Sequence, residues 1–236
     1  MGKVIFFVAF ICCVNSVAQD ITGIQLLEKS IKYHDPHNSW KSFNGDFTVT
    51  MESPKGDLRI SEISLNLPQQ YFELSTIKEK NTILQILDKG ICTLNFNGKT
   101  EISKEDKATY RINCKRATTM KNYYSYLYGL PMKLKDSGTI IDSVVKTKTF
   151  KGKTYLVLKA TYEKEVGKDI WYFYFNPNTY AMEVYQFFHD EVKNDGEYIL
   201  LTGEETIQGV KMPKVRAWYY NNNDGYLGTD ILSRTN

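Results

Sequence analysis

The sequence predicts a mainly β protein of the α+β class, in which a long antiparallel meander is interrupted by one helix. Two observations carry this prediction. The chain of 236 residues holds 17 Tyr and 12 Phe but only 15 Gly and 6 Pro, a composition that favours pleated, half-buried strands over helical bundles. From residue 47 onward, apolar residues recur with a period of two in short runs separated by turn residues, which is the pattern of β-strands.

The overall composition excludes two classes of protein. Hydrophobic residues make up 42% of the chain and charged residues 24%, which is typical of a globular protein and not of a disordered one. The 30 basic and 27 acidic residues give a formal net charge of +3. So small an excess is too weak to drive nucleic-acid binding by counterion release, and we expect no nucleic-acid partner.

The N-terminus has the pattern of an export signal. A short positive start precedes an apolar run at residues 4–14, and small residues follow at 16–18. Residues 1–18 are therefore predicted to be a signal peptide cleaved after Ala18, and residues 19–236 a single periplasmic or secreted domain. The apolar run covers about half of the roughly 20 residues needed to cross a bilayer, so we expect no membrane span after cleavage.

Two of the four cysteines lie in the predicted signal peptide and two lie in the mature chain. Cys12 and Cys13 stand at the end of the apolar run, where lipid attachment is the alternative to simple cleavage, although the preceding Ile11 is larger than such sites prefer. Cleavage leaves Cys92 and Cys114 in a compartment where a disulfide persists. We predict a disulfide between them, with two free buried thiols as the alternative.

Helices and strands are located by the period of the apolar residues. The first helix is predicted to end before Pro36, and its apolar stripe consists of Ile24, Leu27, Ile31 and His34. His34 and His37, near its end, are interpreted as capping or packing residues. The second ends at Gly129 and has the stripe Ala117, Met120, Tyr124 and Leu127. Strands are predicted at residues 47–51, 58–60, 63–67, 71–74, 83–87, 91–96, 140–145, 155–162, 169–175, 181–191, 197–202 and 215–220.

Two turns set the expected register in the second half. A turn at residues 176–179 pairs Phe175 with Tyr180, and therefore Trp171 with Val184, while Asp195-Gly196 suits a two-residue hairpin. One face of the sheet then carries Trp171, Phe173, Phe175, Met182, Val184, Phe188 and Val192. The other face carries Tyr172, Tyr174, Tyr185, Phe187 and His189. Because neither face is polar, the sheet is expected to be covered on both sides or to line a cavity.

Several motifs resemble those of known exported proteins. The N-terminal helix, the meander, the inserted helix and the late Gly209-Val210-Lys211-Met212-Pro213 together resemble the periplasmic lipoprotein-carrier (LolA-like) superfamily. That resemblance implies a curved, incomplete barrel that wraps around both helices and leaves an apolar cavity. A group of uncharacterised exported proteins of Bacteroidetes-type bacteria has similar motifs at residues 30–36, 123–132, 171–174, 189–191 and 194–198. This group has no known activity, so it implies no reaction.

The function we expect is that of a non-enzymatic carrier or binding protein for a lipid or another apolar small molecule, with an envelope protein as a second candidate partner. The residues predicted to line the ligand cavity are Trp171, Phe173, Phe175, Met182, Val184, Phe188 and Asp190. The alternative is that the apolar members of this set form a closed core.

His189, Asp190 and Glu191 carry the main alternative, an envelope hydrolase or a metal-assisted enzyme. Strand alternation sends Asp190 to the apolar face, away from its neighbours, where its pKa should rise unless a partner is present. We favour a structural ion pair there. The sequence has no zinc-binding Cys/His pattern and no Gly-rich phosphate loop, so we expect neither a metal nor a cofactor. A third hypothesis is a scaffold that binds a protein at a sheet edge.

Overall fold

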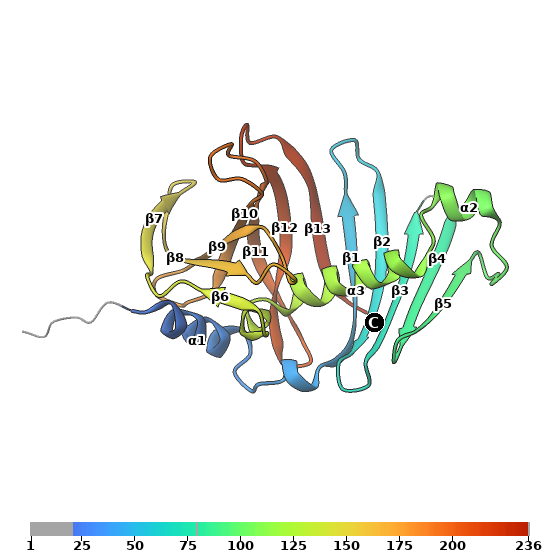
Figure 1. Cartoon of the computed structure of the whole chain (residues 1–236), viewed down its shortest axis with the longest axis horizontal. Helices are drawn as coiled ribbons and strands as arrows, with labels where there is room; N and C mark the ends of the chain where they lie inside the picture. The colour runs from blue at the N-terminus through green and yellow to red at the C-terminus, as the bar shows by residue number, and fades with distance from the viewer. Residues whose placement is uncertain (1–20, 79, 236) are drawn as a thin grey trace, which may run out of the picture.

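The computed structural model describes residues 21–78 and 80–235 (Figure 1). The predicted signal peptide at residues 1–18 lies outside them. The described strands form one 13-stranded sheet in which neighbouring strands pair antiparallel. The predicted mainly β class and the antiparallel meander are confirmed. No helix in the described part of the chain is long and apolar enough to cross a membrane.

The helices are α1 (Gly23–His34), α2 (Lys104–Thr109) and α3 (Cys114–Gly129), with short 3-10 turns at Trp40–Ser42 and Met132–Lys135. The strands are β1 (Asn44–Glu52), β2 (Leu58–Asn66), β3 (Tyr71–Lys78), β4 (Asn81–Asp88), β5 (Ile91–Phe96), β6 (Thr139–Ile141), β7 (Lys146–Phe150), β8 (Lys153–Tyr162), β9 (Ile170–Phe175), β10 (Met182–Phe188), β11 (Glu197–Ile207), β12 (Val210–Tyr220) and β13 (Tyr226–Arg234).

The first and last strands meet in the middle of the sheet. β1 pairs with β2 on one side and with β13 on the other. From this centre, β1 to β5 form one wing, and β13 back to β8 form the other, with β6 and β7 pairing with β8 at the far edge. The sheet curves (Figure 1) but its path has two open ends. It is therefore an incomplete barrel.

Helix α3 runs along one face of the sheet, across several strands (Figure 1). Its buried side chains include all four residues of the predicted stripe, Ala117, Met120, Tyr124 and Leu127. Tyr128 continues the stripe, and its ring centroid lies 5.0 Å from that of Phe47 on β1. Burial of this face holds the helix against the sheet. The predicted inserted helix is confirmed, and the short α2, which was not predicted, precedes it in the same insertion.

Helix α1 ends at His34, as Pro36 predicts. A capping box between Thr22 and Gln25 fixes its start. The buried stripe is rotated relative to the predicted one, because Leu26 and Ser30 are buried whereas Ile24 is 50% exposed. Spacing alone fits either stripe, and packing against the sheet decides between them.

His34 joins α1 to two strands. Its Nε2 accepts a hydrogen bond from the main-chain N–H of Met182 at 2.9 Å, and its Nδ1 lies 2.8 Å from the main-chain oxygen of Lys211. The ring is therefore neutral with the proton on Nδ1, and burial lowers its pKa. This packing role agrees with the interpretation from the sequence.

Apolar side chains cover both faces of the wing formed by β8 to β11, as predicted. The main core lies on the face that carries α1 and α3 and includes Leu158 and Phe173. A smaller cluster on the opposite face consists of Tyr155, Val157, Tyr174 and Val184. Phe150 at the end of β7 packs on it, with its ring 5.2 Å from that of Tyr174.

The hairpin of β9 and β10 has a different register from the predicted one. Met182 pairs with Phe175, and a bulge follows before Val184. Because the bulge adds one residue, the side chains of β10 beyond it point to the opposite face from the prediction. Tyr185, and not Val184, therefore lies on the core face opposite Phe173.

The strand β10 also ends earlier than predicted, and residues 189–196 form a loop before β11. The predicted two-residue hairpin is therefore wrong. The side-chain amide of Asn221 donates to the main-chain oxygens of Phe187 and Asp195 at 2.9 and 2.8 Å, which ties this loop to the end of β12. Val192, expected on the apolar face, is 95% exposed.

Candidate ligand pocket beneath helix α3

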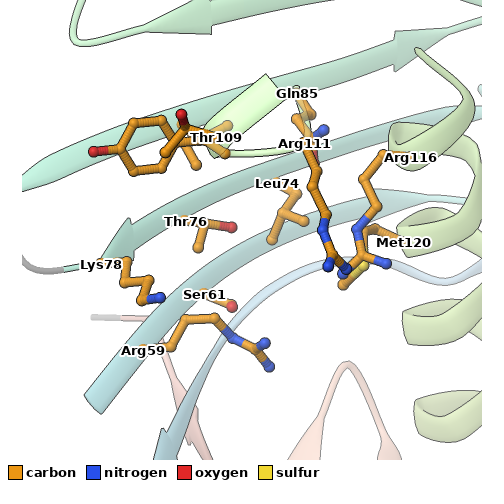
Figure 2. Close-up of a pocket in the computed structure, with 12 residues that line it drawn as sticks. Arg59, Ser61, Leu74, Thr76, Lys78, Gln85, Thr109, Arg111, Arg116 and Met120 are labelled. Atoms are coloured by element: carbon orange, nitrogen blue, oxygen red, sulfur yellow. The ribbon is translucent and has the colours of Figure 1, made fainter. Parts of the chain in front are cut away.

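Two adjoining cavities lie between α3 and the sheet. Their volumes are about 370 and 400 Å³, and they share Arg59, Arg116 and Met120. The first (Figure 2) is also lined by Ser61, Leu74, Thr76, Lys78, Ile83, Gln85, Thr109, Tyr110 and Arg111. The second is also lined by Met51, Thr119, Tyr123, Glu197, Trp218, Leu227, Gly228 and Asp230. We call the two together the α3 pocket.

Strand register brings the floor of the first cavity together. Arg59 pairs with Lys78, and Ser61 pairs with Thr76. Thr76 also pairs with Ile83 on β4. Paired residues of an antiparallel sheet point to the same face, so these side chains form one row across β2, β3 and β4, facing α3.

The first cavity is cationic. Its lining includes no acidic side chain, and four basic ones, Arg59, Lys78, Arg111 and Arg116. None of the four forms an ion pair with another residue in the described ranges. Unpaired positive charges that line one concave surface raise the local concentration of anions.

Two polar atoms of the floor are buried without a partner. Arg59 Nε and Ser61 Oγ make no hydrogen bond to any described residue. Most buried polar atoms in proteins are hydrogen-bonded. A buried polar atom without a hydrogen bond lowers the free energy of unfolding by roughly 1–3 kcal/mol.

The second cavity holds the acidic side chains of the α3 pocket. Asp230 accepts a hydrogen bond from Trp218 Nε1 at 3.0 Å. Burial raises the pKa of Asp230, and Arg216 and Arg59 offset part of that rise. Burial also raises the pKa of Glu197. Both carboxyl groups therefore ionise less readily than usual, and the basic side chains dominate the shared wall.

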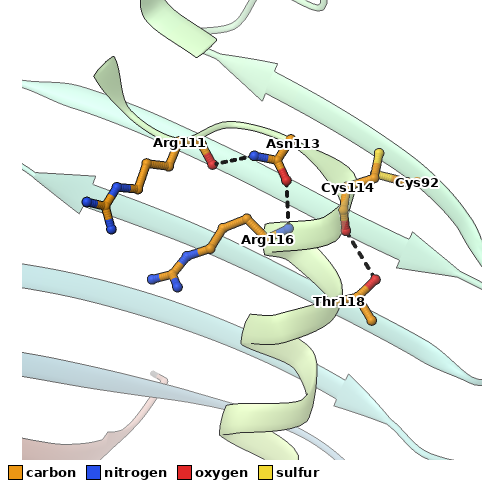
Figure 3. Close-up of a disulfide and its surroundings, with 6 residues drawn as sticks. All are labelled: Cys92, Arg111, Asn113, Cys114, Arg116 and Thr118. Carbon is orange, nitrogen blue, oxygen red and sulfur yellow. Dashed lines mark hydrogen bonds between the residues drawn. A yellow bond between two sulfur atoms is a disulfide. The ribbon is translucent and has the colours of Figure 1, made fainter. Parts of the chain in front are cut away.

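The start of α3 is fixed at three points (Figure 3). Cys114, the first residue of the helix, forms a disulfide with Cys92 on β5, with 5.9 Å between their Cα atoms. Asn113 caps the helix by accepting from the N–H of Arg116 at 2.8 Å. Its amide also lies 3.4 Å from the main-chain oxygen of Arg111. The basic residues of the turn and the helix are thus held on a rigid support.

The residues predicted to form one cavity wall separate in the structure. Val184 and Phe188 lie on the opposite face of the sheet, because of the bulge in β10, and the ring of Phe188 packs 5.9 Å from that of Tyr172. The prediction of one shared face is therefore wrong for these two residues. Phe173, Phe175 and Met182 belong to the main core, and Trp171 packs against it. Ligand contact by these four stays a prediction.

The cluster at residues 189–191 does not come together either. Asp190 lies in the loop after β10, so its predicted place on the apolar face is wrong. Lys193 is the partner that removes the expected rise, and its bond lowers the pKa of Asp190. His189 Nδ1 lies 2.7 Å from Asp169, which raises the pKa of the histidine. Glu191 accepts hydrogen bonds from the hydroxyl of Tyr172 and the ammonium group of Lys159. The ion pair favoured for Asp190 is present, at 3.1 Å from Lys193. No group of three or more potential metal ligands occurs in the described chain.

Sequence reasoning missed the basic residues of the α3 pocket. Arg59 stands in phase with Ser61 and Ile63 on the predicted strand pair, so alternation could have placed it on the core face. Arg111 and Arg116 flank the start of the second helix. No local motif connects them to Arg59, because the cavity forms only when β2 and α3 are brought together.

A protein-family model matches residues 3–234 of the chain. The chain belongs to the DUF6503 family. This is a family of unknown function, and no curated protein matches this DUF6503 chain.

Solved structures with a similar fold cover most of the DUF6503 chain. A LolA superfamily protein from Nitrosomonas europaea matches with a TM-score of 0.50 and 12% identity, over 91% of this chain and 92% of its own. A candidate outer membrane lipoprotein-sorting domain from Vibrio parahaemolyticus has a TM-score of 0.47 and 11% identity, over 91% and 90%. A DUF1329 family protein from Desulfovibrio piger has 0.49 and 8%, over 91% and 92%. The first match shows that the DUF6503 fold is LolA-like, as the sequence motifs predict.

Proposed function

We propose that this protein is an exported, non-enzymatic carrier that binds a lipid or another apolar ligand in the α3 pocket. The observation that carries the proposal is a concave sheet face, partly covered by one helix, that retains open volume beneath that helix. Ligand sites in proteins are concave, mainly apolar and provided with a few polar groups.

The lining of the α3 pocket supports an apolar ligand. Met120 lines both cavities. Leu74 and Ile83 line the first cavity, and Met51 and Leu227 line the second. Each CH₂ group of a ligand that leaves water for such a lining contributes roughly 0.8 kcal/mol. Flexible methionine side chains adapt to chains of different shape.

Fold and sequence support the rest of the proposal. The likeness to a LolA superfamily structure concerns the fold, and the α3 pocket lies on the face of the sheet that α3 covers. The signal-like pattern at residues 1–18 and the Cys92–Cys114 disulfide both favour an oxidising compartment outside the cytoplasm. We place the protein in the periplasm or outside the cell.

Native mass spectrometry of the protein purified from an envelope extract of its host tests this function. We expect a co-purifying lipid-sized mass that is reduced by Ile83→Thr, which keeps a β-branched residue but adds a hydroxyl to the lining. Ile91→Thr, on the exposed surface of β5, is the matched control. An unliganded protein in every preparation, or equal occupancy in both variants, would contradict the proposal.

A further inference from the structure

We propose that Arg59, Arg111 and Arg116 form a binding site for the anionic head group of the ligand, so that the protein binds an amphiphile carrying a phosphate or carboxylate. The proposal rests on the carrier function above and specifies the chemistry of its ligand. The head group would lie against the guanidinium groups, and the chain against Leu74 and Met120.

Three arginines from different elements converge on one cavity. Arg59 is on β2, Arg111 is in the turn between α2 and α3, and Arg116 is in the first turn of α3, yet all three line one cavity. In Figure 2 the side chains of Arg111 and Arg116 extend in the same direction, into the pocket. Positions far apart in the sequence thus supply three planar donors to one space.

The pocket arginines also lack a counter-charge in the described part of the chain. Some basic side chains of the described chain pair with acidic ones, as Arg234 does with Glu205 at 2.6 Å. The three arginines of the pocket form no such pair among the described residues. An anion that enters the pocket therefore displaces no acidic side chain from these guanidinium groups.

The arrangement of the basic residues is also unfavourable for the ligand-free protein. Arg59 is placed directly opposite Lys78 in the register, and like charges at such positions destabilise a sheet. Arg59 Nε is buried without a partner, and Arg111 has a φ of 55°, in the left-handed region that costs non-glycine residues energy. Three unfavourable features at one pocket are typical of a functional site.

Guanidinium chemistry identifies the class of head group. The planar fork of arginine presents paired N–H donors that match the oxygens of carboxylates and phosphates. The disulfide of Cys114 and the cap provided by Asn113 hold the turn that carries Arg111 and Arg116, so little ordering is needed when the anion binds. The adjoining apolar lining then selects anions that carry a chain.

Isothermal titration calorimetry with three ligands, each below its micelle concentration, tests the proposal. The ligands are decyl phosphate, the neutral decyl glucoside and inorganic phosphate. The variants are Arg111→Gln and Arg116→Gln, both at exposed positions that tolerate substitution, and Lys115→Gln, which removes a neighbouring charge outside the pocket. Urea unfolding of each variant verifies that it is folded.

We expect decyl phosphate to bind at least tenfold more tightly than decyl glucoside. Each arginine variant should lose roughly tenfold in affinity for decyl phosphate, because hydrogen bonds between charged groups are stronger than those between neutral groups. Lys115→Gln should bind like the wild type. Equal binding of both decyl ligands, unaffected by the arginine variants, would overturn the head-group site and leave the carrier function standing. Binding of inorganic phosphate alone would keep the anion site and overturn the carrier function. Failure of every ligand to bind would overturn both.

Discussion

Arg59 on β2 and Lys78 on β3 lie directly opposite each other, and both side chains line the same cavity. Two positive charges at paired positions repel each other, so this part of the sheet is less stable than it could be. A bound anion would remove the repulsion. The pair therefore links the stability of the empty protein to the occupancy of the α3 pocket.

Replacing Lys78 by Gln should raise the free energy of unfolding of the ligand-free protein by roughly 0.2–1 kcal/mol at low ionic strength. The gain should shrink in high salt, because salt screens exposed charges. Urea unfolding at two salt concentrations measures both effects. Lys80→Gln, which removes an exposed charge outside the pocket, is the control, and an equal gain in both variants would show that the pairing with Arg59 is irrelevant.

Loss of the disulfide should weaken both stability and binding. The bond joins residues separated by 22 positions, and a loop of that size corresponds to roughly 3 kcal/mol in the loop-entropy model. The double variant Cys92→Ser with Cys114→Ser should lower the urea midpoint accordingly and also weaken binding of decyl phosphate, since the start of α3 carries Arg116. An unchanged midpoint would mean that the disulfide does not anchor the helix.

His34 should make the protein less stable in acid. Burial lowers the pKa of His34 in the folded state, so the unfolded chain takes up a proton first as the pH falls. The stability contributed by the neutral ring is complete above the unfolded pKa of about 6.5 and is lost below it. His34→Leu should be less stable than the wild type at neutral pH but should vary less between roughly pH 7 and pH 5.

The histidine prediction has an internal control. The pKa of His189 is raised by its bond to Asp169, so its contribution has the opposite sign and is lost as the pH rises. Chemical denaturation at a series of pH values should therefore show a steeper acid loss in His189→Gln than in His34→Leu. The same pH profile in both variants would contradict the role assigned to the buried ring.

Phe173→Ala separates packing from ligand contact. Phe173 is fully buried in the main core, so its truncation should cost roughly 3–5 kcal/mol of unfolding free energy. It does not line the α3 pocket, and affinity for decyl phosphate should stay within about twofold of the wild type while the variant remains folded. A large loss of affinity with little loss of stability would instead support the cavity predicted around this residue.

Much of the fold follows from periodicity. Both long helices and the meander are predictable because each buries one regular stripe or face, and the predicted stripe residues Met120 and Tyr124 are buried on α3. β13 was not predictable in this way. Its buried positions are Gly228, Asp230 and Leu232, of which only the last is a bulky apolar residue, so the strand shows no apolar alternation.

The site was harder to predict than the fold. The bulge before Val184 places the following side chains of β10 on the faces opposite to those predicted. No local sequence feature predicts a bulge of this kind. The arginines of the α3 pocket come from separate segments and become neighbours only through long-range packing. The apolar periodicity of a segment indicates which of its residues are buried. It does not indicate where the packed segments leave an open cavity.

Photo-crosslinking identifies where on the protein an anionic amphiphile binds, which we propose is the α3 pocket. The probe is decyl phosphate with a diazirine in its chain, and the labelled residues are identified by mass spectrometry of proteolytic peptides. We predict labels on Leu74, Ile83 and Met120 that excess unlabelled decyl phosphate removes. Competable labels confined to the opposite face of the sheet, around Tyr174, or no competable label at all, would contradict the account.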